Sequence, residues 1–139
     1  MADYDAVTLP IMDHVSIVVA DLEASRAFYT AALAPLGLVE VGRDAAGGTG
    51  FGTATGRDDF WIGSCLDGPP SRGVHVAFTA VSREQVQAFH AAALAAGGTE
   101  RLAPGVQLQY SDRYYGAFVN DLDGNNIEAV FHSPEPIVD

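Results

Sequence analysis

Two short apolar segments of this chain, "HVSIVV" and "HVAFTA", each begin with a histidine, His14 and His75. A third apolar segment, "NNIEAVF", contains a single carboxylate, Glu128. A neutral imidazole is a common metal ligand and also a general base. A carboxylate in an apolar segment is costly to bury unless it is paired or binds a metal. These three side chains are therefore the first candidates for chemistry.

The elements that must position these groups are short β-strands, because the segments are rich in β-branched residues. Successive side chains of a strand point to opposite faces, so alternation predicts that all three groups lie on the face opposite the core. If the strands belong to sheets that curve together, the three groups converge. The residues expected to share their faces are Ser16 and Val18 with His14, Ala77 and Thr79 with His75, and Asn126, Val130 and His132 with Glu128.

Two histidines and one carboxylate form the facial triad that holds non-haem Fe(II), and Mn, Ni, Co or Zn also suit these ligands. Calcium, which prefers oxygen ligands, does not. The alternative is structural, since a histidine in a strand is more often a hydrogen-bonded interior group than a ligand. In that interpretation Glu128 is paired with His75 or Arg26.

The two histidine segments belong to an internal repeat. With an offset of 61 residues, "AFYTAALA" (27–34) aligns with "AFHAAALA" (88–95), and the two histidine segments align with each other. Each copy reads as a strand, a helix with apolar residues at helical spacing, and three further strands separated by Gly, Asp and Asn. The expected helices cover 21–33 and 82–98, with Ser82 as N-cap. The repeat predicts a duplicated supersecondary unit.

The predicted organisation is one α+β domain over residues 1–139, made of two βαβββ modules with two main helices. Module 1 covers about 11–66 and module 2 about 73–132, with short tails. The terminal "SPEPIVD" is expected to be a loose tail or a short docking arm.

Composition limits the function classes. The net charge is −11 and all seven basic residues are arginine, which disfavours nucleic acid and anionic membranes as partners. No apolar stretch approaches the length of a membrane span, and the first residues lack a signal-peptide pattern, so we expect a cytoplasmic protein. Cys65 is the only cysteine, which excludes an internal disulfide and favours a small buried residue.

Three segments, "MDHVSIVVADLEASRAFY", the second histidine strand and "YYGAFVNDLDGNNIEAV", resemble the vicinal-oxygen-chelate superfamily over about residues 11–132. That family includes glyoxalase I, extradiol dioxygenases and the bleomycin- and fosfomycin-resistance proteins. The resemblance implies an open, cup-shaped eight-stranded sheet, with metal ligands His14, His75 and Glu128 on the first and last strands. Aligning Ile62 with Ile127 places Gly63 at the fourth ligand position, which leaves three ligands.

The resemblance leaves the reaction open. The missing second carboxylate argues against ordinary glyoxalase I, which has four ligands. An extradiol signature would have a histidine near Gln109–Ser111 and a proline at Leu122, and both are absent. The expected enzyme therefore binds two adjacent substrate oxygens on a divalent metal, as a lyase, isomerase or dioxygenase. The candidate acid–base groups are His132, Tyr114 and Tyr115, and the candidate substrate contacts are Arg113, Trp61 and Asn126.

A different class of function also fits. A metal-free protein that binds a cationic drug, like the bleomycin-resistance members, would explain the net charge of −11, the aromatic residues and Gly63. Both functions imply a small-molecule ligand and a homodimer. The sequence does not decide whether the cup is built within one chain or between two. Because Tyr114 and Tyr115 alternate in a strand, one is expected in the core and the other in the cup.

Overall fold

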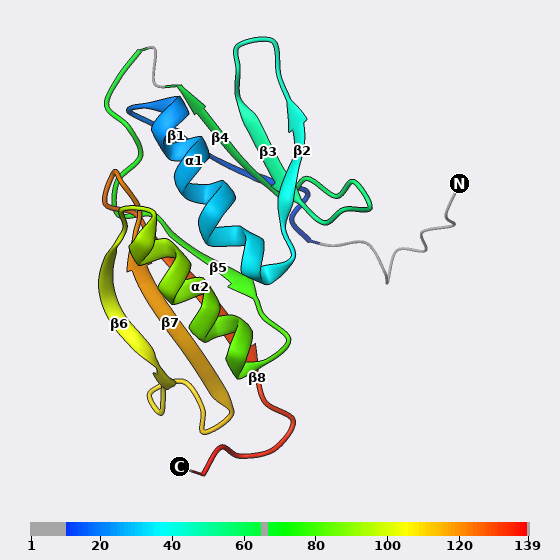
Figure 1. Cartoon of the computed structure of the whole chain (residues 1–139), viewed down its shortest axis with the longest axis vertical. Coiled ribbons are helices and arrows are strands. Elements are labelled where there is room, and N and C mark those ends of the chain that lie inside the picture. Colours follow the sequence, from blue (N-terminus) through cyan, green and yellow to red (C-terminus); the bar gives the residue numbers. More distant parts are fainter. Residues whose placement is uncertain (1–10, 65–66, 139) are drawn as a thin grey trace.

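The computed structural model describes residues 11–64 and 67–138, and two βαβββ modules follow each other along the chain (Figure 1). Each module forms its own four-stranded sheet, and no ladder joins the two sheets within the described ranges. The elements of module 1 are β1 Val15–Val19, α1 Leu22–Leu33, the short 3-10 helix η1 Ala34–Leu36, β2 Val39–Arg43, β3 Thr49–Gly52 and β4 Phe60–Ser64. Those of module 2 are β5 His75–Thr79, α2 Arg83–Ala95, β6 Thr99–Val106, β7 Tyr114–Asn120 and β8 Asn126–His132.

The strand order is the same in both sheets. Sheet A runs β1-β4-β3-β2 and sheet B runs β5-β8-β7-β6, with the first strand of each module parallel to its last strand and the other pairs antiparallel. The predicted α+β class and the duplicated βαβββ module are therefore confirmed. Neither four-stranded sheet closes into a barrel.

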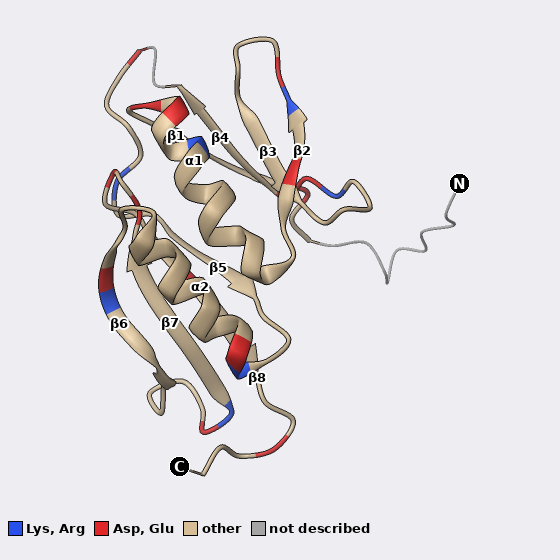
Figure 2. Ribbon diagram, viewed as in Figure 1, with Lys and Arg blue, Asp and Glu red and all other residues tan. Residues whose placement is uncertain are grey.

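Both helices begin at a side-chain cap. Asp21 accepts a hydrogen bond from the backbone of Ala24 at 3.0 Å, and Ser82 accepts one from the backbone of Gln85 at 3.1 Å, which confirms the predicted cap at Ser82. Acidic residues occupy the first turn of each helix, where they favour the positive end of the helix dipole (Figure 2). Helix α2 ends at Ala95, and Gly97 then takes the left-handed conformation with φ of 109°.

The core lies between the helices and one face of each sheet. Figure 1 shows α1 and α2 side by side on the same side of the sheets. Ile17 and Val19 of β1 belong to the buried core and are 2% and 0% exposed. Phe60 of sheet A meets Phe78 of sheet B edge to face at 5.2 Å between ring centroids. Because the helices cover only one side, the other face of each sheet is open, and the two histidine segments point their polar side there.

A buried hydrogen bond joins the two modules. Tyr29 of α1 donates from its hydroxyl to Asp121 at 2.5 Å, and Asn125 also donates to that carboxylate. Burial, together with the nearby carboxylate, raises the pKa of the Tyr29 hydroxyl far above its usual value, so it stays protonated. The turn after β7 is thus anchored to the helix of module 1.

The C-terminal segment is a docking arm. The backbone of Ile137 donates to the carbonyl of Asp112 at 2.9 Å, and its side chain packs against the core. Arg113 donates to the carbonyl of Pro134. Of the two alternatives predicted for this segment, the docked one is therefore observed. Cys65 lies outside the described residues. Among the helices in the described ranges, none has the length and apolar character needed to cross a membrane.

Candidate functional site

A row of four polar side chains crosses the open face of sheet B. The Nε2 nitrogen of His75 lies 2.7 Å from one oxygen of Glu128, and the hydroxyl of Tyr114 donates to the other oxygen. The ring of His132 meets the ring of Tyr114 edge to face at 5.2 Å between centroids. Strand pairing produces this row, since Tyr114 is the partner of His132, and Ala77, two residues after His75, is the partner of Glu128. The strand alternation in the sequence therefore predicted correctly that His75, Glu128 and His132 lie on the open face of sheet B.

Glu128 is the most unusual member of the row because its side chain is 0% exposed. A buried carboxylate is tolerated only when its oxygens are hydrogen-bonded, and both oxygens here have a partner. Gly116 on the neighbouring strand leaves room for it, since a Cβ at that position would lie 3.2 Å from the carboxylate. Burial and the Glu128 hydrogen bond raise the pKa of Tyr114 well above its usual value. Tyr114 is therefore a protonated donor throughout the physiological pH range.

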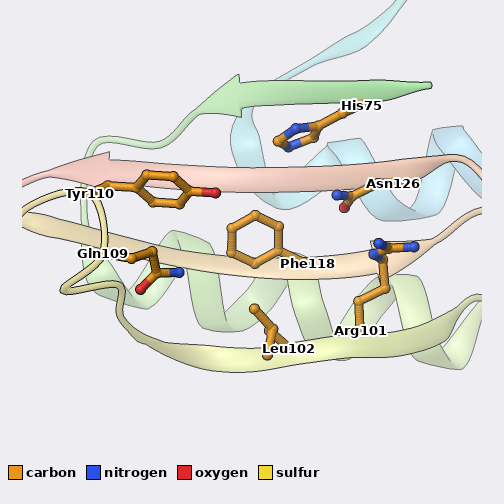
Figure 3. Close-up of a pocket in the computed structure, with 7 residues that line it drawn as sticks. All are labelled: His75, Arg101, Leu102, Gln109, Tyr110, Phe118 and Asn126. Atoms are coloured by element: carbon orange, nitrogen blue, oxygen red, sulfur yellow. The ribbon is translucent and has the colours of Figure 1, made fainter. Parts of the chain in front are cut away.

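A cavity of about 440 Å³ opens beside this row. Figure 3 shows Phe118 in its middle, with His75 on the β5 side and Arg101 on β6. The Oδ1 atom of Asn126 is buried and has no hydrogen-bond partner among the described residues. Arg101 donates to the side chain of Asn120 at 3.0 Å. The residues lining the cavity are His75, Arg101, Leu102, Gln109, Tyr110, Phe118 and Asn126.

This cavity contains residues that the sequence did not indicate. Arg101, Phe118 and Tyr110 were not singled out as candidates, whereas Asn126 was predicted as a substrate contact and does line the cavity. The available signal was weak. Phe118 alternates with the buried Val119 and Ala117 in β7, which places it on the open face, but β6 contains register shifts that obscure the face of Arg101.

His14 lies on the other module. Its Nδ1 nitrogen is 2.7 Å from a carboxylate oxygen of Asp13, and its side chain is 53% exposed. It lines a second cavity, of about 490 Å³, on the open face of sheet A. In the part of the chain that the structure describes, no group of three or more His, Cys, Asp or Glu side chains is placed to hold a metal. One chain thus brings His75 and Glu128 together, and His14 is not with them.

The strand registers correct the predicted fourth ligand position. Ala77 pairs with Glu128 in sheet B, and its repeat counterpart Ser16 pairs with Trp61 in sheet A. The module 1 counterpart of Glu128 is therefore Trp61, and Gly63 corresponds to Val130. The alignment of Ile62 with Ile127 was therefore wrong by two residues. A shift of two residues leaves each side chain on the same face of the sheet, so strand alternation could not reveal it. An indole cannot replace the carboxylate, so the expected count of three ligands does not change.

The remaining candidates are placed as follows. Tyr115 lies on the helix side of β7, 4% exposed, where Gln87 donates to its hydroxyl at 2.9 Å, so the choice between the two tyrosines narrows to Tyr114. Arg113 is held at Pro134 and does not line either cavity. Arg26 pairs with Glu40 at 2.9 Å, which leaves His75 as the partner predicted for Glu128 in the structural alternative.

The class of protein follows from this geometry: paired βαβββ modules with uncovered sheet faces, one of which presents a buried carboxylate bonded to an imidazole. The family model described as Glyoxalase/Bleomycin resistance protein/Dioxygenase superfamily matches residues 11–129. The chain belongs to this superfamily. A comparison with curated proteins finds no match.

Solved structures support the same assignment. A glyoxalase/bleomycin resistance protein from Albidiferax ferrireducens T118 is 33% identical, with a TM-score of 0.75 over 88% of this chain and 98% of that one. A putative glyoxalase from Bacillus halodurans is 23% identical, with a TM-score of 0.70 over 91% and 99%. The fosfomycin resistance protein FosX from Listeria monocytogenes, a mutant complexed with Mn(II) and 1S,2S-dihydroxypropylphosphonic acid, is 18% identical, with a TM-score of 0.63 over 93% and 95%. The last two show a shared fold.

Proposed function

We propose that this protein is a metal-dependent enzyme whose active site is assembled between two copies of the chain. His75 and Glu128 of one copy and His14 of the other would be the ligands of one divalent ion. The donor set of two imidazoles and one carboxylate suits Fe, Mn, Ni, Co or Zn. Two of the three donors are already in contact, at 2.7 Å. A homodimer, a small-molecule substrate and a cytoplasmic location are parts of this proposal.

The observation that carries the proposal is the position of Glu128. A carboxylate with no exposed surface is seldom the most stable choice for a strand interior, because a neutral residue avoids its desolvation. Here it lies beside a cavity on an uncovered face, and the adjoining glycine keeps space around it. Such placement is typical of a functional carboxylate.

The chemistry would divide among the residues around the cavity. A divalent ion held by His75, Glu128 and the other copy's His14 would supply Lewis-acid polarisation of two adjacent substrate oxygens. Tyr114 donates its only hydroxyl proton to Glu128, so its role would be to hold that carboxylate in place as a ligand. Arg101 would bind an anionic substituent, and the free Oδ1 atom of Asn126 would accept a hydrogen bond from a substrate hydroxyl. These roles are compatible with isomerase, lyase or oxygen-dependent ring-cleavage chemistry.

A metal-free binding protein is the second candidate, and one observation favours it. Both oxygens of Glu128 have protein partners without a metal, so the network is complete as it stands. In that case the two cavities would bind a ligand by shape and charge alone.

Subunit mixing tests the two-copy site. The His14→Ala and Glu128→Ala variants should each lose bound Mn(II) or Zn(II), measured by elemental analysis after metal loading. When they are mixed and allowed to exchange subunits, half of the dimers contain both variants, and each mixed dimer has one intact site. The mixture should therefore regain about a quarter of the metal content of the wild type.

A matched mixture provides the control. His75→Ala and Glu128→Ala affect the same half of the site, so mixing them should restore no metal. If the His14→Ala mixture also stays empty after confirmed subunit exchange, the site does not form between copies. If the wild-type protein binds no metal at all, the metal-free candidate replaces the enzyme.

A further inference from the structure

A further cavity, of about 600 Å³, lies at the end of sheet B, where β6 begins and β7 turns into β8. We propose that this cavity binds the phosphate group of a small phosphate monoester, with Arg72 and Arg101 as its cationic contacts. Arg101 also lines the cavity on the open face of sheet B (Figure 3), whereas Arg72, Thr99 and Leu122 line neither open-face cavity. The inference therefore does not depend on the metal site.

The charge of the two arginines is unusual in a chain with 18 acidic and seven basic residues. Three other arginines, Arg26, Arg43 and Arg57, make ion pairs with glutamate or aspartate. Across residues 11–64 and 67–138, no carboxylate forms an ion pair with Arg72 or Arg101. A guanidinium group that no carboxylate neutralises is available to an anion from solution.

Side-chain hydrogen bonds hold one wall of the cavity in place. The amide oxygen of Asn120 accepts from Arg101 at 3.0 Å, and its amide nitrogen donates to the hydroxyl of Thr99 at 2.9 Å. The first bond positions the guanidinium group and uses one of its five N–H donors. Because the Thr99 oxygen acts as acceptor in the second bond, its own proton is left for another acceptor. Phosphate oxygens can accept hydrogen bonds from both groups.

Arg72 reaches the cavity from the segment between β4 and β5. Its side chain is exposed, and its Nε atom lies 3.5 Å from the position that a Cβ of Gly124 would take. The side chain thus lies along the turn between β7 and β8. Two guanidinium groups from separate segments therefore line one cavity, and a phosphate dianion can accept charge-assisted hydrogen bonds from both.

The nearby carboxylates are already bonded to other groups. Asp121 is the acidic residue among the described residues that line the cavity, and it is 6% exposed. Its oxygens accept hydrogen bonds from Tyr29 and from the backbone and side chain of Asn125. Glu100 of β6 lies 2.8 Å from Nε2 of His90 on α2. Two cations thus line the cavity together with one buried carboxylate, which favours an anionic ligand.

The cavity has room for more than a phosphate group. Gly73, Gly97 and Gly124 have φ angles of 76°, 109° and 91°, and they contribute no side chain to the lining. Leu122 is 42% exposed and adds an apolar surface. A small organic substituent on the phosphate would cover this surface, which favours a monoester over free phosphate.

Calorimetric titration of the metal-free full-length protein at low ionic strength tests this inference. The probe is butyl phosphate at about pH 8, where a phosphate monoester is a dianion. Butyl sulfate has nearly the same shape and one charge less, and inorganic phosphate lacks the organic part. We expect butyl phosphate to bind at least about fivefold more tightly than butyl sulfate and about threefold more tightly than inorganic phosphate.

Three variants locate the probe. Arg72→Gln should weaken butyl phosphate binding about tenfold, because charge-assisted donors are lost from an exposed side chain that the fold does not need. Arg43→Gln removes the same charge from sheet A, and Gln109→Ala changes the cavity on the open face of sheet B. Each of these two controls should change the affinity less than about twofold. Unchanged binding by Arg72→Gln, an equal loss in Arg43→Gln, or equal binding of either reference anion would overturn the inference.

Discussion

Replacing Glu128 with glutamine separates the functional and structural roles of this buried carboxylate. Glutamine has nearly the same shape, so it leaves no cavity. Its amide oxygen accepts the hydrogen bond of Tyr114, and its amide nitrogen donates to His75 once that imidazole presents an unprotonated Nε2. Every polar group keeps a partner, and only the charge is lost.

The magnitude follows from two opposing effects. Hydrogen bonds to a charged group contribute about 1.5–3 kcal/mol and neutral ones about 0.5–1.5, so weakening two bonds destabilises the protein. Removing the charge from a site with 0% exposure also removes a desolvation penalty of similar size, which stabilises the variant. We expect a net change within about 1 kcal/mol for Glu128→Gln without metal. Glu128→Ala, which leaves two donors unpaired and a cavity, should lose about 2–4 kcal/mol.

With metal present, the wild-type protein should be clearly more stable than Glu128→Gln. At a free ion concentration 100 times its Kd, the wild-type protein gains about 2.7 kcal/mol of stability. An amide is a weaker ligand than a carboxylate, and a tenfold loss of affinity reduces the gain to about 1.4 kcal/mol. The assay is urea unfolding of both proteins, first with a chelator and then with Mn(II).

Two results would contradict this reasoning. A loss of more than about 2 kcal/mol for Glu128→Gln in chelator would mean that the fold needs the charge itself. Full metal stabilisation of Glu128→Gln would mean that the carboxylate is not a ligand.

Three further predictions concern stability. Above about pH 10 the protein should lose stability, because Tyr29 and Tyr114 have raised pKa values and release their protons only on unfolding; urea unfolding at pH 8 and pH 11 measures this. Tyr29→Phe should cost about 1.5–3 kcal/mol, since Asp121 loses a buried donor, and an unchanged urea midpoint would exclude a role for this bond. Gly52→Ala should cost about 3 kcal/mol or more in thermal unfolding, because its Cβ would overlap the carbonyl of Arg57 at 1.3 Å.

The repeat and the alternation of strands predicted most of the fold. An offset of 61 aligns not only the histidines but also Asp21 with Ser82 and the first residues of both helices, Leu22 and Arg83. Caps and apolar spacing are local properties, so a single sequence reveals them. The same alternation placed His75 and Glu128 on one face, and the structure brings them into contact.

Strand register is less accessible from the sequence than strand face. A shift of two residues keeps every side chain on its face, so hydrophobic patterning does not detect it. Gly63 was therefore aligned with Glu128 although Trp61 has that position. The face of Arg101 was hidden for a related reason, because irregular pairing in β6 breaks the alternation. In both cases backbone pairing between distant segments decides the site, and no local pattern encodes it.

The corrected register also shows why the two copies of the module present different surfaces on their open faces. Three matched positions differ together: glycine, glycine and tryptophan in module 1 stand against Leu102, Phe118 and Glu128 in module 2. A large indole requires the two small residues beneath it, whereas a short carboxylate leaves room for large ones. The three positions share one space, so a bulky residue in place of Gly50 or Gly42 would displace the indole of Trp61. Both modules have a histidine at or just before the start of their first strand, but only module 2 has a carboxylate at the matching position of its last strand. Under the proposed two-copy assembly, the first module would therefore supply one imidazole and an aromatic surface, and the second an imidazole, a carboxylate and an arginine.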